Sequence, residues 1–386
     1  MAVELVTAPP ISPAAGPRPD QLRVLMVTPR FHPFTGGVES HVAEVARRLA
    51  AAGQPLTILT TDPGGGWPVD ESREGYHVHR VRAWPRERDY YFAPGVADYI
   101  MRGPWDVVHV QSYHTLVAPL AMAAAWRAGL PYVVTFHGGG HSARIRQAFR
   151  RVQRLALRPL LAQARRLVAV AEFEVALYGR ELRLGPERFA VIPNGSELPA
   201  PSGGPARTGT LIVSVGRLER YKGHHRILAA LPYVLREQPD ARLWIVGAGP
   251  YEAELRQQAA RLGMNGRVKI QAIPPEARPA MAAALGRAQL VVLLSEFETH
   301  PIAVLEALAL GRPVLVADTS GLSALARQGW ASAVPLHSSP AEVAQAVLRQ
   351  LRHPLTPPAL RLPSWDDCAA DLGRLYATLR EEPVCG

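Results

Sequence analysis

The stretch from Ser295 to Val314 reads S-E-F-E-T-H-P-I-A-V-L-E-A-L-A-L-G-R-P-V and directly follows the apolar run Leu290–Leu294. A short apolar run bounded by polar residues predicts a buried strand, and Ile302–Leu310 has the pattern of a short helix. Glu298 then falls in the loop between strand and helix, and Glu306 lies about one and a half turns into the helix. The two carboxylates therefore belong to one strand–loop–helix segment.

The start of this helix is predicted to bind an anion. Pro301 suits the first turn of a helix, where its missing N–H costs little. The backbone N–H groups around Ile302 and Ala303 have no acceptor within the helix, and the helix dipole adds to their attraction for negative charge. The helix end could hold phosphates, while Glu298 and Glu306 could accept hydrogen bonds from a sugar and a ribose. Two isolated glutamates would more simply be surface residues, but the whole string favours a binding site.

Strand-like and helix-like patterns alternate on both sides of a break at residues 193–209. The expected strands are Arg23–Thr28, Pro55–Thr60, Val107–Val110, Tyr132–Phe136 and Leu167–Val170 before it, and Leu211–Val215, Arg242–Val246, Val268–Gln271, Leu290–Leu294 and Pro313–Ala317 after it. This alternation is typical of doubly wound α/β sheets. The break is rich in Pro, Gly and Ser and predicts a linker. Two such halves predict a cleft between two domains, with ligands at the carboxyl ends of the strands.

A second candidate site follows the strand Leu211–Val215. Residues 215–223 read V-G-R-L-E-R-Y-K-G. Arg217 and Lys222 could both reach a pyrophosphate at the end of the strand, Arg through a forked contact and Lys as a point charge. Of the 43 Lys and Arg residues, only Lys222 and Lys269 are lysines. A lysine kept in this loop therefore favours a function over simple solvation.

Three further glycine-containing loops also follow predicted strands. Gly36 and Gly37, in P-F-T-G-G-V-E, precede the first helix, and Gly249, in V-G-A-G-P, follows a strand of the second half. Glycines at these places let the backbone approach a phosphate, a ribose or a base closely. His137 opens H-G-G-G-H after Tyr132–Phe136, so we expect its side chain at the carboxyl end of that strand, facing the cleft. Alone, a glycine pair or a single histidine is as often structural.

Together these motifs resemble the large retaining glycosyltransferase family 4, which has the GT-B fold of two Rossmann-like domains facing across a cleft. The resemblance runs from Arg23 to Leu379 and rests on E-x7-E, on G-R-L-x-x-x-K-G and on G-R-P-V at residues 311–314. It implies a last helix, Trp365–Leu379, that crosses back to the N-terminal domain. We expect a disordered tail at 1–20, an acceptor-side domain at 21–195, a linker at 196–209, a nucleotide-sugar-binding domain at 210–362 and the returning segment at 363–386.

The resemblance also implies roles in binding the donor. Glu298 would bind hydroxyls of the donor sugar, and Glu306 would bind the donor ribose. Arg217 and Lys222 would hold the diphosphate and help the nucleotide leave. Because basic side chains and a helix N-terminus would neutralise the diphosphate, the resemblance implies no divalent metal and no cofactor.

Other roles concern the reacting centre and the backbone around the phosphates. His137 would contact the transferred sugar near the reacting carbon, so His137 and Glu298 are the candidates for catalysis. Gly36 and Gly37 would line the phosphate site from the N-terminal domain, and Gly249 would allow close contact with the base or ribose.

Some positions depart from the family pattern. Thr299-His300-Pro301 stands where the family has Gly-Phe-Gly after the first glutamate, so one N–H is lost and His300 could supply a donor instead. The usual second glycine and later glutamate are absent from Ser320–Leu325, and Ala171 replaces the usual serine. These changes leave the fold untouched and bear on the sugar and the base.

Length and composition agree with two soluble domains. The chain has 386 residues, of which 48% are hydrophobic and 20% charged. No apolar run reaches the roughly 18 residues that a membrane span needs. The first 20 residues lack the pattern of a secretory signal, so we expect a cytoplasmic protein. The only cysteines, Cys368 and Cys385, have neither a metal-ligand nor a redox spacing.

A basic segment bears on the acceptor. Eight arginines lie between Arg144 and Arg166, interleaved with apolar residues, and the formal net charge of the chain is +10. A basic amphipathic segment can lie on an anionic bilayer, which would place the protein at the inner face of the membrane with a lipid-linked sugar or glycolipid as acceptor. An ordinary surface helix in an arginine-rich protein is the alternative, and a soluble glycan or small-molecule acceptor is then equally compatible.

The expected activity is metal-independent, retaining transfer of a hexose-type sugar from a nucleotide sugar, with a UDP-sugar expected from family frequency and with front-face attack by the acceptor hydroxyl. A nucleotide-sugar epimerase, a phosphorylase or a degenerate binding protein could share the fold, although E-x7-E argues against the first two. A nicotinamide dehydrogenase would need G-x-G-x-x-G after the first strand, which is absent. No nucleic-acid module or interleaved aromatic platform appears, so we expect no nucleic-acid partner.

Overall fold

The computed structural model describes residues 22–34, 36–85, 91–138, 144–196, 198–200, 209–274, 277–355 and 362–381. Contacts divide the chain into two compact units. The first unit comprises residues 1–136, 159–167 and 369–386, and the second comprises 137–158 and 168–368. The domain limits, the linker and the cleft expected from the sequence stay predictions. The expected tail at 1–20 and most of the expected linker, 201–208, lie outside the described residues.

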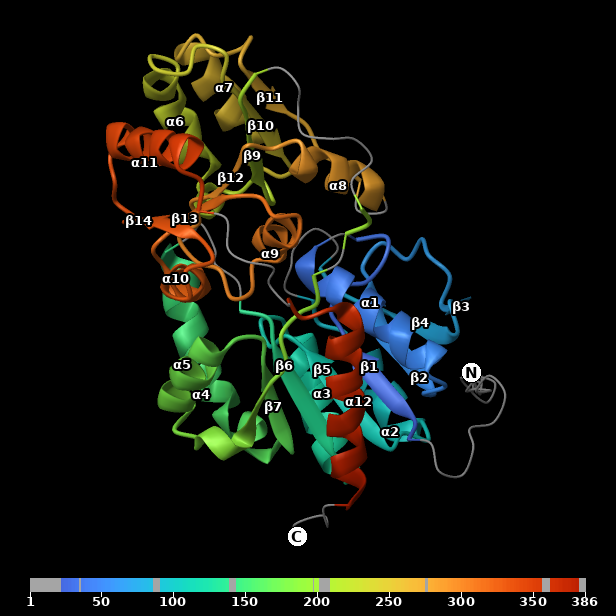
Figure 1. Cartoon of the computed structure of the whole chain (residues 1–386). Helices are drawn as coiled ribbons and strands as arrows, with labels where there is room; N and C mark the ends of the chain where they lie inside the picture. Colours follow the sequence, from blue (N-terminus) through green and yellow to red (C-terminus); the bar gives the residue numbers. More distant parts are fainter. Residues whose placement is uncertain are drawn as a thin grey trace. The chain divides into compact units, whose positions relative to one another are not determined.

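Strands and helices alternate along most of the described part of the chain (Figure 1). The first half contains β1 Val24–Val27, α1 Gly37–Ala51, β2 Leu56–Asp62, β3 Asp70–Arg73, β4 Tyr76–Arg82, α2 Gly95–Arg102, β5 Val107–Gln111, α3 Val117–Arg127, β6 Tyr132–Phe136, α4 Arg144–Gln163, β7 Arg166–Ala169, α5 Glu172–Leu182, the 3-10 helix η1 Pro186–Arg188 and β8 Phe189–Val191. The second half contains β9 Leu211–Val215, the 3-10 helix η2 Arg220–Lys222, α6 His224–Val234, β10 Arg242–Val246, α7 Glu252–Arg261, β11 Val268–Ile270, α8 Arg278–Gly286, β12 Leu290–Leu293, α9 Ile302–Ala309, β13 Val314–Ala317, α10 Ser320–Arg327, β14 Ser332–Val334, α11 Pro340–Arg352 and α12 Trp365–Glu381.

The first sheet has eight strands in the order β3-β4-β2-β1-β5-β6-β7-β8. Its strand β1 pairs in parallel with β2 on one side and β5 on the other, so that Val24 lies opposite both Leu56 and Val107. The order of the strands therefore reverses between β1 and β5. A reversal of this kind opens a crevice at the carboxyl ends of the strands, and Gly36 and Gly37 lie in the segment that leads from β1 into α1.

The sequence does not predict β3 and β4 at the edge of this sheet. β4 pairs in parallel with β2, and β3 pairs antiparallel with β4. The residues of β4, Y-H-V-H-R-V-R, alternate between fully and partly buried positions along most of the strand and include four polar or charged side chains. They lack the continuous apolar run that marks the central strands. The pairs β2–β1, β1–β5 and β5–β6 are parallel, as predicted.

The last helix, α12, is drawn in red in Figure 1 and joins the first unit from Ala369 onward. Tyr376 Oη lies 2.5 Å from Nδ1 of His109 in β5, and His109 Nε2 lies 2.6 Å from Thr135 Oγ1 in β6. Burial lowers the pKa of His109 to about 3, so the ring is neutral at neutral pH and links helix and sheet through hydrogen bonds. The predicted return of the last helix is confirmed.

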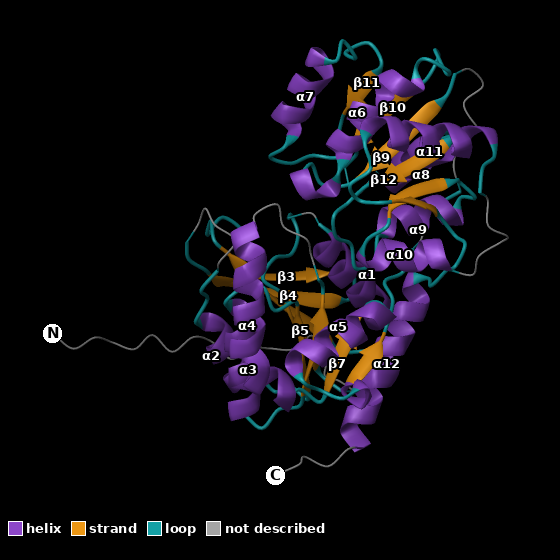
Figure 2. Cartoon of the chain, turned by 90° about the vertical axis from the view of Figure 1, so that its left-hand side faces the viewer, coloured by secondary structure: helices purple, strands orange, loops and turns teal. Residues whose placement is uncertain are grey.

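The second sheet has six strands in the order β11-β10-β9-β12-β13-β14, and its neighbours pair in parallel. Helices cover both of its faces (Figure 2). Successive residues of β9 point to opposite cores: Ile212 packs with α6, α7 and α11, whereas Val213 packs with α8, α9 and α10. Burial on both faces explains the continuous apolar strands. The order reverses between β9 and β12.

The predicted strands agree closely with the observed ones. β6, β9 and β10 have the predicted limits, and the other predicted strands differ by one or two residues at an end. Over the ranges that the structure describes, no helix combines the length and apolar character needed to cross a membrane.

Candidate functional site

The loop after β9 is held against the end of β12. Gly223 has a φ of 76°, and a Cβ added to it would lie 1.9 Å from the carbonyl oxygen of Leu294. His224, which begins α6, places Nδ1 2.8 Å from Ser214 Oγ. Burial lowers the pKa of His224 to about 4, so the ring is neutral at neutral pH. Its contact with Ser214 connects the start of α6 to β9. This packing fixes Lys222 beside the segment that follows β12.

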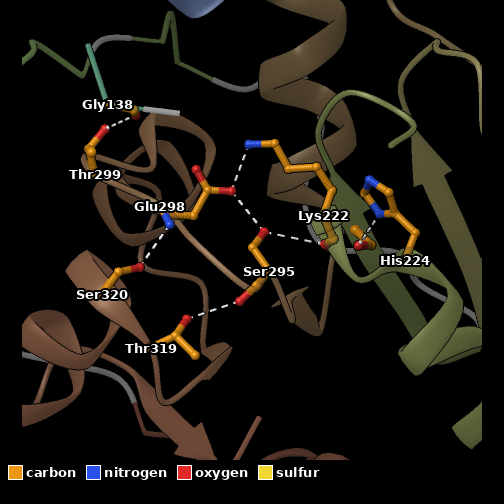
Figure 3. Close-up of polar contacts among 9 residues, drawn as sticks. Gly138, Lys222, His224, Ser295, Glu298, Thr299, Thr319 and Ser320 are labelled. Carbon is orange, nitrogen blue, oxygen red and sulfur yellow. Dashed lines mark hydrogen bonds and ion pairs between the residues drawn. The ribbon is translucent and has the colours of Figure 1, made fainter. Parts of the chain in front are cut away.

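Lys222 and Glu298 form an ion pair at the switch point of the second sheet (Figure 3). Lys222 Nζ lies 2.7 Å from Glu298 Oε1, and the two side chains are 17% and 11% exposed. Burial disfavours the ammonium ion, but the Glu298 carboxylate more than offsets this and holds the pKa of Lys222 above its ordinary value. The structure therefore brings together one predicted phosphate-binding cation and one predicted sugar-binding carboxylate.

Glu298 is held by short contacts within its own loop and to the start of α10. Ser295 Oγ lies 2.7 Å from Glu298 Oε1, and the Glu298 N–H donates to Ser320 Oγ at 2.8 Å. The Gly321 N–H donates to the Glu298 carbonyl at 2.9 Å. A Cβ on Gly321 would lie 2.3 Å from the carbonyl oxygen of Thr299, so this glycine permits a close approach. Sequence reasoning identified none of these contacts, because serines and glycines near a loop are common.

Arg217, the second predicted phosphate-binding cation, lies in an exposed part of the same loop. Its Nη2 is 2.6 Å from Glu219 Oε1, and its side chain is 58% exposed. The Glu219 side chain is only 11% exposed, but the guanidinium itself lies in solvent and can exchange this partner for another anion. The structure places Arg217 after β9, as predicted, but turned toward a carboxylate of its own loop.

The structure corrects the predicted place of Pro301. Pro301 is the N-cap of α9, with φ −79° and ψ 87°, and the helix begins at Ile302. The Pro301 carbonyl accepts hydrogen bonds from the N–H groups of Val304 and Leu305. Ile302 and Ala303 are the first two helical residues, whose N–H groups have no acceptor within a helix. Pro301 supplies no side-chain cap hydrogen bond, and an anion site at these two amides stays a prediction.

Glu306 is buried on α9 and pairs with Arg278 at the start of α8. Burial raises the pKa of Glu306, and the Arg278 guanidinium offsets only part of this effect. Sequence reasoning missed Arg278, because one arginine among so many carries no distinguishing signal. The candidate ribose-binding carboxylate thus lies in contact with a cation from a neighbouring helix.

Thr299 links the Glu298 loop to the segment after β6. Thr299 Oγ1 donates to the carbonyl of Gly138 at 2.9 Å (Figure 3). Gly138 directly follows His137, and Thr299 directly follows Glu298, so this bond joins the segments that carry both candidate catalytic residues. The rest of the glycine run and His141 lie outside the described residues.

His300 contacts the protein backbone. Its Nε2 lies 3.0 Å from the carbonyl oxygen of Asn194. Burial lowers the pKa of His300 to about 4, and hydrogen bonds to the backbone of Asn194 and Val170 oppose this shift only in part. The ring is therefore neutral and engaged by the protein, and its predicted donation to the nucleotide sugar stays a prediction.

The structure gives Gly249 a close neighbour within the protein. A Cβ on Gly249 would lie 2.5 Å from the carbonyl oxygen of Leu218, so this glycine lets the loops after β9 and β10 pack together. Its contact with a nucleotide stays a prediction.

Gly36 caps the first turn of α1, which begins at Gly37, and nothing among the described residues lies within 4 Å of a Cβ added to Gly37. These two glycines belong to the first unit, and their role as a phosphate lining also stays a prediction.

Comparison with known proteins assigns both halves of the chain. Residues 36–195 match the family described as "Glycosyl transferase 4-like domain", and residues 201–359 match "Glycosyl transferases group 1". The GDP-mannose:cellobiosyl-diphosphopolyprenol alpha-mannosyltransferase of Xanthomonas oryzae is 30% identical over 77% of this chain and 79% of its own length. The D-inositol 3-phosphate glycosyltransferase of Jonesia denitrificans is 29% identical over 89% of this chain and 92% of its own length.

A solved structure shares the fold. The sucrose-phosphate synthase of Thermosynechococcus elongatus superimposes with a TM-score of 0.76 at 20% identity and covers 94% of this chain and 100% of its own. Two parallel α/β sheets, the returning last helix and the site between β9 and β12 therefore define a glycosyltransferase of the GT-B type. The chain belongs to glycosyltransferase family 4, and the predicted membership of that family is confirmed.

Proposed function

We propose that this glycosyltransferase moves a hexose-type sugar from a nucleoside diphosphate sugar to a hydroxyl group, with retention at the anomeric carbon and without a divalent metal. The Lys222–Glu298 pair at the carboxyl ends of β9 and β12 carries this proposal. An ammonium ion next to a helix N-terminus suits a diphosphate, and a fixed carboxylate suits sugar hydroxyls. The two groups come from the loops after β9 and β12, and their direct contact supports a single donor site.

In the proposed reaction the acceptor oxygen bonds to the anomeric carbon while the bond from that carbon to the diphosphate breaks on the same face. The hydroxyl proton passes to the departing phosphate oxygen. Lys222, Arg217 and the amides of Ile302 and Ala303 stabilise the negative charge that develops on the diphosphate. Lys222 is held in place before the reaction begins, whereas Arg217 must leave Glu219 to join it.

The remaining candidate residues bind the sugar and the nucleoside. Glu298 accepts hydrogen bonds from the sugar hydroxyls, Glu306 accepts them from the ribose, and His137 contacts the sugar near the reacting carbon. Arg278 must share Glu306 with the ribose, because the guanidinium already contacts that carboxylate.

Two donors and two kinds of acceptor follow from the proposal. A UDP-sugar is the expectation from the family, and GDP-mannose is the donor named for the Xanthomonas relative. That relative is named for a diphosphopolyprenol acceptor and the Jonesia relative for an inositol phosphate, so acceptors that carry phosphate are the first to test. Glycans and unphosphorylated small molecules form the second group.

We expect Glu306→Ala to weaken nucleotide-sugar binding tenfold or more, because a hydrogen bond to a charged group contributes about 1.5–3 kcal/mol. The measurement is a thermal-shift screen with UDP-, GDP-, ADP- and dTDP-sugars in the presence of EDTA. A ligand at about 100 times its Kd adds about 2.7 kcal/mol of stability, which raises the midpoint by about 5 °C. The variant should lose about half of that rise or more, because a tenfold weaker ligand at the same concentration adds only about 1.4 kcal/mol.

Glu296→Gln is the matched control, because Glu296 lies in the same string but pairs with Arg226. Its shift should equal that of the wild type. A folded wild-type protein that responds to none of these donors at millimolar concentration would count against the proposal. Binding without transfer to any acceptor, or interconversion of the bound sugar, would instead favour a degenerate binding protein or an epimerase. Binding that EDTA abolishes would contradict independence from metal.

An anionic membrane surface remains our proposal for the partner of α4. Val152 and Leu155 are 61% and 52% exposed, and Ala156 and Pro159 are exposed along the same stripe of the helix. Arg154 pairs with Glu181 of α5, so this arginine of the predicted basic surface is used within the protein. The side chains of residues 144–151 lie outside the described ones.

We therefore expect Val152→Ser combined with Leu155→Ser to lower partition onto vesicles containing phosphatidylglycerol about 30-fold, since each apolar side chain contributes about 1 kcal/mol at an interface. Co-sedimentation with these vesicles measures the effect, and phosphatidylcholine vesicles test the need for negative charge. Tyr233→Ser, at an exposed position on α6, should bind like the wild type. Equal sedimentation of the double variant and the wild type would remove α4 from the membrane contact.

A further inference from the structure

Glu174 is a fully buried carboxyl group in the first turn of α5. Its exposed fraction is 0%, and its Oε2 accepts a hydrogen bond from the Val170 N–H at 2.8 Å. Its Oε1 is buried and has no hydrogen-bond partner of good geometry within the described ranges. None of the proposed binding roles uses this residue. A buried carboxyl oxygen without such a partner requires a physical explanation.

Glu174 lies directly against the segment that carries His137. A Cβ added to Gly138 would lie 2.9 Å from Glu174 Oε1, 2.8 Å from Tyr178 Oη and 2.6 Å from Thr299 Cγ2. These three side chains therefore surround one side of the Gly138 α-carbon and leave no room for a side chain there. On its other side Gly138 is fixed, because its carbonyl accepts the hydrogen bond from Thr299 Oγ1.

The surroundings of Glu174 favour its neutral form. Burial raises the pKa of Glu174 to about 8, and the backbone N–H groups of Val170, Gly138 and Ala171 offset this only in part. No charged side chain is among the causes of the shift. Among the described residues, the ionisable groups nearby are Tyr178 on the same helix, whose ring faces the Arg154 guanidinium of α4, and His300, which contacts the Val170 backbone and is itself neutral. At neutral pH the carboxyl group therefore keeps its proton.

We propose that Glu174, in its protonated form, is a positioning residue that holds the His137–Gly138 segment against Thr299. Oε2 already accepts the Val170 N–H, so the acid proton belongs on Oε1, which faces Gly138 and Tyr178 Oη. Ionisation would place an unpaired charge next to the Gly138 α-carbon and displace the segment. Its consequence for catalysis rests on the proposed function, because it acts through His137.

The first test does not depend on activity. The ring signals of His137, in protein labelled with ¹³C-histidine and assigned with His137→Asn, are followed by NMR from pH 6 to pH 9. In the wild type they should move with an apparent pKa of about 8, the value of Glu174. In Glu174→Gln this movement should be absent, because the amide has nearly the same shape and cannot ionise. An unchanged titration in Glu174→Gln overturns the proposal.

The second test uses transfer activity. At one pH unit above its pKa about one tenth of an acid remains protonated, so the wild-type kcat should fall about tenfold more between pH 7 and pH 9 than that of Glu174→Gln. Glu174→Gln should keep at least half of the wild-type kcat at pH 7, whereas Glu174→Ala should lose about 10- to 100-fold. Glu172→Gln, at an exposed position in the same turn, should behave like the wild type throughout.

The two tests separate the two proposals. If the wild type transfers no sugar but His137 responds to Glu174 as described, the proposed function fails and the positioning role stands. If the wild type is active and Glu174→Gln shows the same alkaline fall in kcat, the positioning role fails. A folded Glu174→Gln without activity at pH 7 also overturns it, because the acid would then be needed for more than its shape.

Discussion

Lys222→Ala is expected to lower kcat/KM for sugar transfer about 100- to 1,000-fold, the usual cost of removing one fixed group that stabilises a developing anion. Lys222 is the least exposed of the two cations placed at the donor site, and its pKa lies above the ordinary value because of Glu298. It therefore stays charged at neutral pH. Steady-state kinetics with the donor found by thermal shift measure the loss, which should fall mainly on kcat.

Removing Lys222 also leaves Glu298 without its countercharge, so stability must be separated from catalysis. Lys222→Ala combined with Glu298→Gln removes both charges, and it should recover any lost stability while transfer stays low. Lys222→Arg should restore part of the rate. Lys269→Ala changes the only other lysine, which lies over the Trp244 ring, and should leave transfer unchanged. A rate for Lys222→Ala within threefold of the wild type would remove this residue from the chemistry.

The sequence predicts the positions of Lys222 and Glu298 because both depend on local rules. Each follows a continuous apolar strand, and the carboxyl ends of parallel strands lie on one edge of a sheet. The sequence does not reveal that the two side chains meet, because that depends on the strand order. Only the reversal between β9 and β12 brings the two loops together.

Contacts between distant segments account for most of what sequence reasoning missed. Arg278 meets Glu306 from another helix, and Ser320 receives the Glu298 N–H from the start of α10. Neither residue differs by type or spacing from many others in the chain. Pro301 shows the limit of a local rule, because proline is compatible with both the first helical position and the N-cap. In the structure it is the N-cap of α9.

Gly223 shows how far the site depends on a single backbone contact. The loop that carries Lys222 turns into α6 at this residue, in the left-handed region of φ. Its α-carbon faces the Leu294 carbonyl at the end of β12 so closely that a Cβ would lie 1.9 Å away. The nearest atoms are all backbone atoms of Leu294, which cannot rotate away as a flexible side chain could. The loop and the strand end can therefore not separate without moving Lys222 from Glu298.

Gly223→Ala is accordingly expected to destabilise the second unit by at least about 3 kcal/mol, because the left-handed φ and the overlap with Leu294 both disfavour the folded state. Gly263→Ala is the matched control: Gly263 has a φ of 68°, but nothing described lies within 4 Å of its added Cβ. It should lower the free energy of unfolding by about 1–2 kcal/mol, the effect of the left-handed φ alone. Thermal unfolding of both variants gives the difference. Equal losses would mean that the contact with Leu294 yields easily, and the donor loop would then tolerate more movement than the fixed Lys222–Glu298 pair requires.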